Sequence, residues 1–459
     1  MSCRLWLVSL FLVLALTACR APAPTPTPSP TVALLTQPSP TPTPAPTHTP
    51  APPAHVQVLR LPGGGYWGHP SPFGFNRGPG YMRASLIFDT LLWRDASGQT
   101  IPWLATGWNV SEDGKTWTFT LREGVRWQDG QPFTSDDVVF TFEYGKAHPD
   151  VGWFMAQLGE VESVTKEGDD QVVIQLERPF APFLQTVAEA LFIIPRHIWE
   201  KVEDPKTYAE PEAFIGTGAY RLVEFSQEEG TYLFEANPDF FLGTPYVRRI
   251  EFVPVSDAAL ALLNGDIAAF DKFGGVNEEM LAPFRQDPFQ IKQAPGEWGM
   301  FLYFNLEKDT PLKDVRVRQA IAYAVDRQAL LERVLLGFGD KGNPGFLPPA
   351  NPYYNPNVPD YAYDLEKAKS LLQEAGYDGT SIQLIYTADE VRVLEIIKAG
   401  LDAIGLKVEP VTMDQATKDA AATEGNYDMM ITGFGGLGSD PDQLRRIFAS
   451  ASRMRGFSR

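Results

Sequence analysis

Residues 107–142 read GWNVSEDGKTWTFTLREGVRWQDGQPFTSDDVVFTF, and the rest of the chain is organised around this stretch. Trp117, Phe119 and Leu121 alternate with threonines, which is the period of a strand with one buried face. Residues 125–127 predict a second short strand, and the Asp-Gly pair at 129–130 predicts the turn that closes it. The three large apolar side chains of the first strand, and Trp127, are expected in the core.

A helix is predicted to begin near Ser135. Thr134 is a suitable N-cap, and Asp136 and Asp137 place carboxylates in the first turn, where the helix dipole favours them. Apolar residues after them give the helix a face for the core. Polar residues in this strand–turn–strand–turn–helix unit therefore serve turns and caps, and they predict no catalytic site.

The order of residues in this unit resembles the signature of the family 5 extracellular solute-binding proteins, the dipeptide-, oligopeptide-, nickel- and oligosaccharide-binding components of ABC importers. Three further motifs carry the same resemblance: IPRHIW at 194–199, IGTGAY at 215–220 and DVRVRQAIAYAVDR at 314–327. Together they cover nearly everything from residue 56 onward. The resemblance implies an α/β, two-lobed periplasmic-binding-protein fold, type II-like, with an extra subdomain in lobe I and no catalytic activity.

The domain organisation follows from changes in composition and pattern. We expect a lipoprotein signal peptide at 1–19, a disordered Pro/Thr-rich tether at 20–54, lobe I at 55–305 with the extra subdomain at about 100–210, and lobe II at 306–459. The family's chain continues past this sequence's last residue, so lobe II is expected to be incomplete, with unpaired strand edges.

Hydrophobic patterns place further elements along the chain. Strands are predicted at 56–61, 171–176, 232–236, 250–254, 382–386, 406–411 and 427–432. Helices are predicted at 81–92, 315–336, 365–375 and 390–404, with another near Gln415, and an extended loop at 343–363. The βαβαβ order after residue 380 implies a parallel sheet covered on both faces, and such sheets bind ligands outside the carboxyl ends of their strands.

The amino terminus predicts export. Arg4 precedes an apolar run at 5–16 that is too short to span a bilayer. Residues 16–19, Leu-Thr-Ala-Cys, resemble a bacterial lipobox, which implies lipidation of Cys19; the alternative is an ordinary signal peptide with a chance cysteine. The protein is thus expected on the outer face of the cell membrane, held through its lipid anchor only, or in the periplasm.

The composition of the chain limits the kinds of partner that we expect. The chain of 459 residues carries a net charge of −18, which argues against nucleic acid or an anionic membrane surface. Its five histidines are scattered, and no HExxH, GxSxG or CxxC arrangement occurs. The sequence therefore predicts no metal site and no cofactor, and we expect a monomer whose partners are a solute and an ABC permease.

Aromatic side chains on loops and strand ends supply the candidate ligand contacts, because the resemblance implies that these positions face the cleft. Flat rings stack on sugar faces or line a pocket for varied side chains. With neighbouring loop residues they form the predicted set: Tyr66, Trp67, Trp153, Phe154, Trp298, Tyr303, Asn305, Phe434, Gly435, Gly436, Leu437 and Asp440. Core packing is the competing explanation for about half of the rings.

The loop after the last predicted strand departs from the dipeptide and oligopeptide relatives. Leu437 falls where their ligand-anchoring aspartate would lie, and no arginine occupies 387–389, where the resemblance places a carboxylate-binding arginine. A buried ligand charge without a counter-charge costs several kcal/mol. Asp440 is the nearest substitute, although it also fits as a helix cap.

The sequence thus predicts a substrate-binding protein of a peptide- or oligopeptide-type ABC importer. Three alternatives stay open. They are a binder of a neutral oligosaccharide, which the loop chemistry favours, a secreted carbohydrate-active enzyme, and a non-functional truncated copy.

Overall fold

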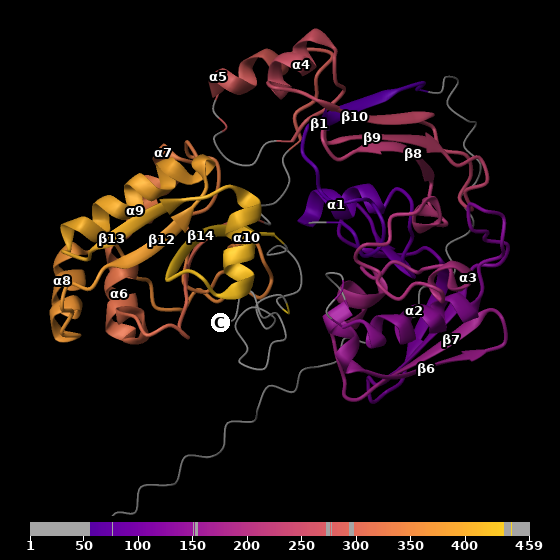
Figure 1. Ribbon diagram of the computed structural model, residues 1–459, viewed down its shortest axis with the longest axis horizontal. Helices are drawn as coiled ribbons and strands as arrows, with labels where there is room; N and C mark the ends of the chain where they lie inside the picture. Colours follow the sequence, from indigo (N-terminus) through magenta and orange to yellow (C-terminus); the bar gives the residue numbers. More distant parts are fainter. Residues whose placement is uncertain are drawn as a thin grey trace, which may run out of the picture. The chain divides into compact units, whose positions relative to one another are not determined.

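The computed structural model describes residues 56–75, 77–149, 151, 155–271, 276, 278–292, 298–435 and 442 (Figure 1). The predicted signal peptide, lipobox and tether lie outside these residues. So do five of the predicted ligand contacts, Trp153, Phe154, Gly436, Leu437 and Asp440, and only the backbone of Phe434 is described. Among the described helices, none has the length and apolar character needed to cross a bilayer.

The first sheet has the strand order β1-β10-β9-β8. Its strands are β1 (Leu59–Gly63), β8 (Tyr220–Ser226), β9 (Thr231–Ala236) and β10 (Arg249–Pro254). β1 runs parallel to β10, and the other neighbours are antiparallel. Helix α1 (Arg77–Ala84) contributes Ala84 to the core on one face of this sheet, together with Tyr232 and Phe252.

The signature stretch builds the second sheet, with the order β4-β5-β7-β6 and antiparallel neighbours throughout. Its strands are β4 (Ala105–Val110), β5 (Thr116–Leu121), β6 (Val161–Glu167) and β7 (Gln171–Leu176). Trp117, Phe119 and Leu121 of β5 are buried, as predicted, and so is Trp127. Helix α2 (Ser135–Ala147) packs Val138 and Phe142 into the same core, and Thr134 and Asp137 form a capping box at its start.

Shorter elements lie between the larger strands and helices along the whole described chain. The strands are β2 (Leu92–Arg94) and β3 (Thr100–Pro102), and the helices are α3 (Arg196–Trp199), α4 (Ala258–Asn264) and α5 (Glu278–Leu281). One π-helical turn spans Leu184–Ala188. Single 3₁₀ turns span Met155–Glu160, Pro211–Phe214, Ala282–Phe284, Pro311–Lys313 and Ala388–Glu390.

The third sheet, which we call the C-terminal sheet, has the order β11-β14-β12-β13 and is drawn in orange to yellow in Figure 1, with β11 earlier on the colour scale. Its strands are β11 (Gly299–Phe304), β12 (Ile382–Tyr386), β13 (Val408–Thr412) and β14 (Met429–Phe434). β12 is parallel to both β13 and β14, so the predicted parallel βαβαβ unit is confirmed. β11 is antiparallel to β14 and precedes residue 306, so this sheet includes a strand that the sequence analysis assigns to lobe I.

Helices cover both faces of the C-terminal sheet. On one face, α6 (Val315–Ala324), α8 (Leu365–Glu374) and α9 (Val391–Ala403) share a core with Leu384 and Ile431. On the other, α10 (Gln415–Glu424) packs against Ile385 and Met430. Neighbouring residues of one strand point to opposite faces, which explains why these near-continuous apolar strands serve two cores. Helix α7 (Arg327–Arg333) follows α6.

Several predicted boundaries are wrong for identifiable reasons. The helix predicted at 81–92 ends at Ala84, because the backbone beyond it turns to pair with the IGTGAY motif: Gly218 N donates to Ile87 O and Tyr220 N to Leu86 O. The helix predicted at 315–336 is two helices, because the Asp326 side chain caps α7 by accepting a hydrogen bond from the amide of Ala329.

One prediction within the signature stretch also needs correction. Residues 125–127 form no strand; Trp127 instead closes a turn through a bond from its amide to Gln131 O, and Arg126 makes an isolated bridge with Pro132. Val151 is buried in the core of the second sheet.

Candidate ligand-binding site

The carboxyl edge of the C-terminal sheet brings together predicted contacts that are far apart in the sequence. β11 is antiparallel to β14, so Gly299 at its start pairs with Phe434 at the end of β14. Trp298 and Gly435, which flank these residues, therefore lie at the edge where β12 and β13 also end. Ligands of parallel α/β sheets bind at this edge.

A glycine in β14 lets the Trp298 ring pack directly against the backbone of that strand. A Cβ atom on Gly433 would lie only 2.0 Å from Cζ2 and 2.6 Å from Cε2 of the Trp298 indole. The ring thus occupies the space that any side chain at position 433 would need. Trp298 nevertheless keeps 44% of its surface exposed, so the edge presents a half-open aromatic face.

An ion pair lies just beyond the last matched residues of the ladder between β12 and β14, which are Ile385 and Met430. Lys418 of α10, with 1% of its side chain exposed, donates to both carboxylate oxygens of Glu390 at 2.7 Å. Its ammonium also donates to the carbonyl of Ile431 at 3.0 Å. Glu390 in turn accepts a hydrogen bond from the amide of Thr387 at 2.7 Å.

This ion pair determines which charged groups at the edge are available to a ligand. The three hydrogens of the Lys418 ammonium match its three acceptors, so none is left for a ligand. Sequence reasoning missed the pair, because a lysine on a surface helix is usually solvated. It also missed Arg392, which is exposed in the first turn of α9, close behind the positions predicted to lack an arginine.

Tyr66 and Trp67 lie in the loop that follows β1, at the carboxyl end of the parallel pair in the first sheet. Both are half-buried. The buried Tyr232 hydroxyl fixes the loop: it accepts from the amide of Trp67 at 3.1 Å and donates to Gly68 O at 2.9 Å. Nearby, burial lowers the pKa of the His69 imidazole, which keeps this ring neutral at pH 7.

Tyr303 and Asn305 do not lie on the edge, which corrects the prediction for both. Tyr303 points to the face of the sheet covered by α10 and is buried there with Ile385 and Met430. Asn305, 1% exposed, donates from Nδ2 to Gly425 O and Tyr427 O and so braces the turn before β14.

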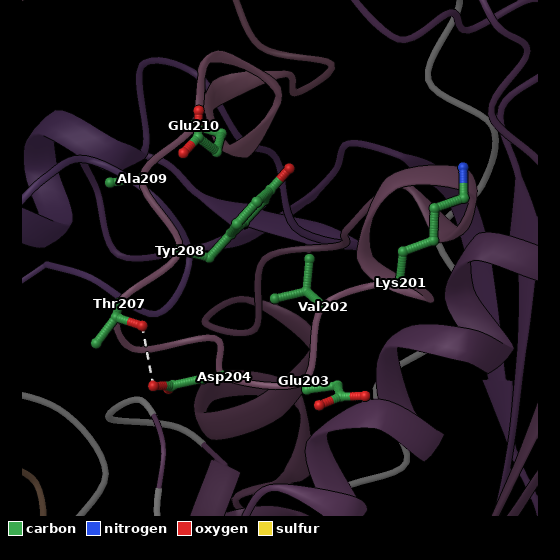
Figure 2. A pocket seen from close by; sticks show the side chains of 8 residues that line it. All are labelled: Lys201, Val202, Glu203, Asp204, Thr207, Tyr208, Ala209 and Glu210. Atoms are coloured by element: carbon green, nitrogen blue, oxygen red, sulfur yellow. Dashed lines mark hydrogen bonds between the residues drawn. The ribbon is translucent and has the colours of Figure 1, made fainter.

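A separate hollow of about 400 Å³ lies in the N-terminal part of the chain and is lined by residues 201–204 and 207–210 (Figure 2). Its most prominent internal contact joins Asp204 to the Thr207 hydroxyl at 2.9 Å. The lining comes from one stretch of the chain, in which Asp204 also accepts a hydrogen bond from the amide of Lys206 at 3.2 Å. In the described residues, no group of three or more His, Cys, Asp or Glu side chains is placed to hold a metal.

Comparisons with known proteins find relatives of this chain in sequence and in structure. The sequence profile described as bacterial extracellular solute-binding proteins, family 5 Middle, matches residues 99–456. The dipeptide-binding protein of Escherichia coli K12 is 31% identical over 85% of this chain and 79% of its own length. Heme-binding protein A of Haemophilus influenzae is also 31% identical, over 82% of this chain and 74% of its own.

The fold matches a solved binding protein as well. The oligopeptide-binding protein AppA from Bacillus subtilis, solved with a nonapeptide, superposes with a TM-score of 0.77 at 22% identity. The match covers 88% of this chain and 84% of that chain. The mixed α/β fold expected from the sequence is therefore confirmed as that of the periplasmic binding proteins.

Proposed function

Because the chain belongs to the family 5 bacterial extracellular solute-binding proteins, we propose that it captures a solute and delivers it to an ABC importer of the peptide or oligopeptide type. The observation that supports this most is the half-exposed Trp298, seated on Gly433 at the carboxyl edge of a parallel sheet. In this proposal residues 55–305 and 306–459 are the two lobes, and the solute lies between them. The relatives are named for the solutes that they bind, so no catalytic step is proposed.

Two classes of solute are supported by different observations. Relatives named for dipeptides and oligopeptides favour a peptide, whose carboxylate Arg392 would meet at the carboxyl end of β12. The neutralised Lys418–Glu390 pair, and the leucine that the sequence has at position 437, favour a solute without terminal charges, such as a neutral oligosaccharide. A peptide, taken up by an importer of the peptide or oligopeptide type, is the first proposal. A neutral solute is the alternative.

A thermal-shift panel tests the proposal. The full chain is melted with di- to pentapeptides and with cello-, xylo- and malto-oligosaccharides, because a ligand that binds only the folded state raises Tm with its concentration. Peptide shifts that vanish on amino-terminal acetylation, and an Arg392→Gln variant that weakens them, support the peptide class. Shifts from the sugars alone support the neutral class. If no probe changes Tm, the proposed solute class is wrong.

Trp298 is expected to contribute to binding through its ring face. Trp298→Ala should weaken the best binder of the panel by about 1 kcal/mol, the scale of an aromatic contact. Gly433→Ala should do the same, because the new methyl group takes the place of the indole. Isothermal calorimetry measures both losses. The control is Tyr353→Ala, which removes a 60% exposed ring from the 343–363 loop and should leave the affinity unchanged.

We further propose that the protein is a lipid-anchored monomer, with Cys19 as the lipidated residue and residues 20–54 as its tether. Cys19→Ala should move the protein from the membrane to the soluble fraction without changing its melting curve. Fractionation followed by immunoblotting measures this. An unchanged membrane fraction would rule out the lipid anchor and leave an ordinary signal peptide.

A further inference from the structure

The Lys418–Glu390 pair is more buried than stability alone would favour. Lys418 is 1% and Glu390 13% exposed, and taking two charges out of water costs several kcal/mol for each ion. Apolar side chains of similar volume in such places often give equal or greater stability. Stability alone therefore does not account for a pair that is buried this deeply.

Both partners of the pair bond the backbone of neighbouring parallel strands, one just past the end of β12 and the other within β14. Glu390 accepts from the amide of Thr387, the first residue after β12. Lys418 donates to the carbonyl of Ile431, one residue beyond the last matched position of β14. The ion pair thus stands just beyond the last matched residues of β12 and β14, where Ile431 still pairs with Leu302 of β11, and it satisfies a polar backbone group beside each strand.

We propose that Lys418 and Glu390 are a positioning pair that sets the spacing between the carboxyl ends of β12 and β14, and thereby the ligand edge at Gly433–Gly435. This inference rests on the proposed function, because it takes that edge as the solute site. The Trp298 indole packs against Gly433, so a shift of β14 moves the indole too. The pair acts through the backbone and does not touch the solute, because its hydrogen bonds are satisfied internally.

The test uses two double variants of the full chain. Lys418→Met/Glu390→Leu replaces the pair by apolar side chains of similar length. Lys398→Met/Asp402→Leu is the matched control: it removes an ion pair with a 2.6 Å contact from the exposed side of α9. The single variant Lys418→Met leaves Glu390 buried without its cation and should lower the urea midpoint, whereas the first double variant should restore it.

The rate of amide hydrogen exchange is the measurement, because a pair with a purely structural role would not change it locally. In Lys418→Met/Glu390→Leu, amides in the segments 384–390 and 429–435 should exchange about tenfold faster than in the wild type, while the remaining segments and the control variant do not change. If the double variant unfolds early, Lys418→Gln/Glu390→Gln takes its place: its amides keep donor and acceptor at both strand ends, and exchange there should stay near the wild-type rate. Local exchange at the wild-type rate in a stable apolar variant, or fast exchange in the amide variant, overturns the inference.

Affinity then separates this inference from the proposed function. The probes are trialanine, N-acetyl-trialanine amide, cellotetraose and xylotetraose. The apolar double variant should bind the best of these about tenfold more weakly than the control does. Wild-type affinity in a variant with faster local exchange removes the link to the solute. Faster exchange with no probe bound by the wild type leaves the positioning pair in place and contradicts the proposed function.

Discussion

Gly216→Ala is expected to destabilise the fold by about 3 kcal/mol or more, the scale of severe overpacking. A Cβ atom at this position would lie 1.9 Å from the carbonyl oxygen and 2.7 Å from the carbonyl carbon of Ile87. Both are backbone atoms, so no side-chain rotation relieves the clash. Gly218 meets the same backbone, with a Cβ 2.5 Å from Ile87 O. The glycines of the IGTGAY motif thus let two backbone segments touch.

Urea denaturation of the purified chain measures this loss. Gly107→Ala is the matched control, because a Cβ there meets no atom within 4 Å. The control should stay within about 0.5 kcal/mol of the wild type, as surface substitutions usually do. Equal midpoints for Gly216→Ala and Gly107→Ala would show that the approach of the motif to Ile87 is not tight.

Asp89→Asn is expected to stabilise the protein at neutral pH. The Asp89 carboxyl is 3% exposed and accepts hydrogen bonds from Thr217 Oγ1 at 2.6 Å and Trp103 Nε1 at 2.7 Å. Burial raises its pKa from 3.8 to about 6, although both hydrogen bonds oppose this shift. Since each pKa unit is worth about 1.4 kcal/mol, keeping this group ionised in the folded state at pH 7.5 costs about 3 kcal/mol.

The sign of the pH dependence follows from that raised value. The folded state holds the Asp89 proton more tightly than the unfolded state, so this contribution is greatest below pH 3.8 and is lost as the pH rises through about 6. The asparagine variant lacks this dependence, and its amide still accepts from Trp103 and donates to Thr217. Its free energy of unfolding should therefore exceed the wild-type value most at pH 7.5, and the difference should shrink towards pH 4. A difference independent of pH would show that Asp89 does not titrate as its burial implies.

Local pattern predicted the fold where one strand or helix carries its own signal. β12 spans the predicted residues 382–386, and the capped start of α2 was readable from Thr134 and its first-turn carboxylates. The helix expected at 315–336 shows where pattern fails. Its apolar residues continue past Ala324, but Gly400 of α9 packs there so closely that a Cβ would lie 2.0 Å from Ala324 O. Contacts of this kind depend on the tertiary fold and leave no periodic trace.

The candidate site was predicted only in part, for the same reason. Trp298 was chosen as a candidate for its aromatic type and its place in the resembled family, and it lies next to Gly299 at the start of β11. Tyr303 has the same chemistry but points to the face under α10, and an antiparallel register that sequence alone does not give decides which residues reach the edge. Lys418 was missed because its role depends on Glu390, 28 positions away. Leu437 and Asp440, outside the described residues, stay predictions.

The central claim is that this chain binds a solute at the edge marked by Trp298. Mass spectrometry of the full chain, purified without added ligand and compared in native and denaturing solution, tests it most directly. We expect the wild-type protein to release a solute of defined mass on denaturation. The Gly433→Ala and Trp298→Ala variants should carry smaller amounts of this solute. A wild-type chain that carries no solute and takes up no peptide or oligosaccharide from the panel would contradict it.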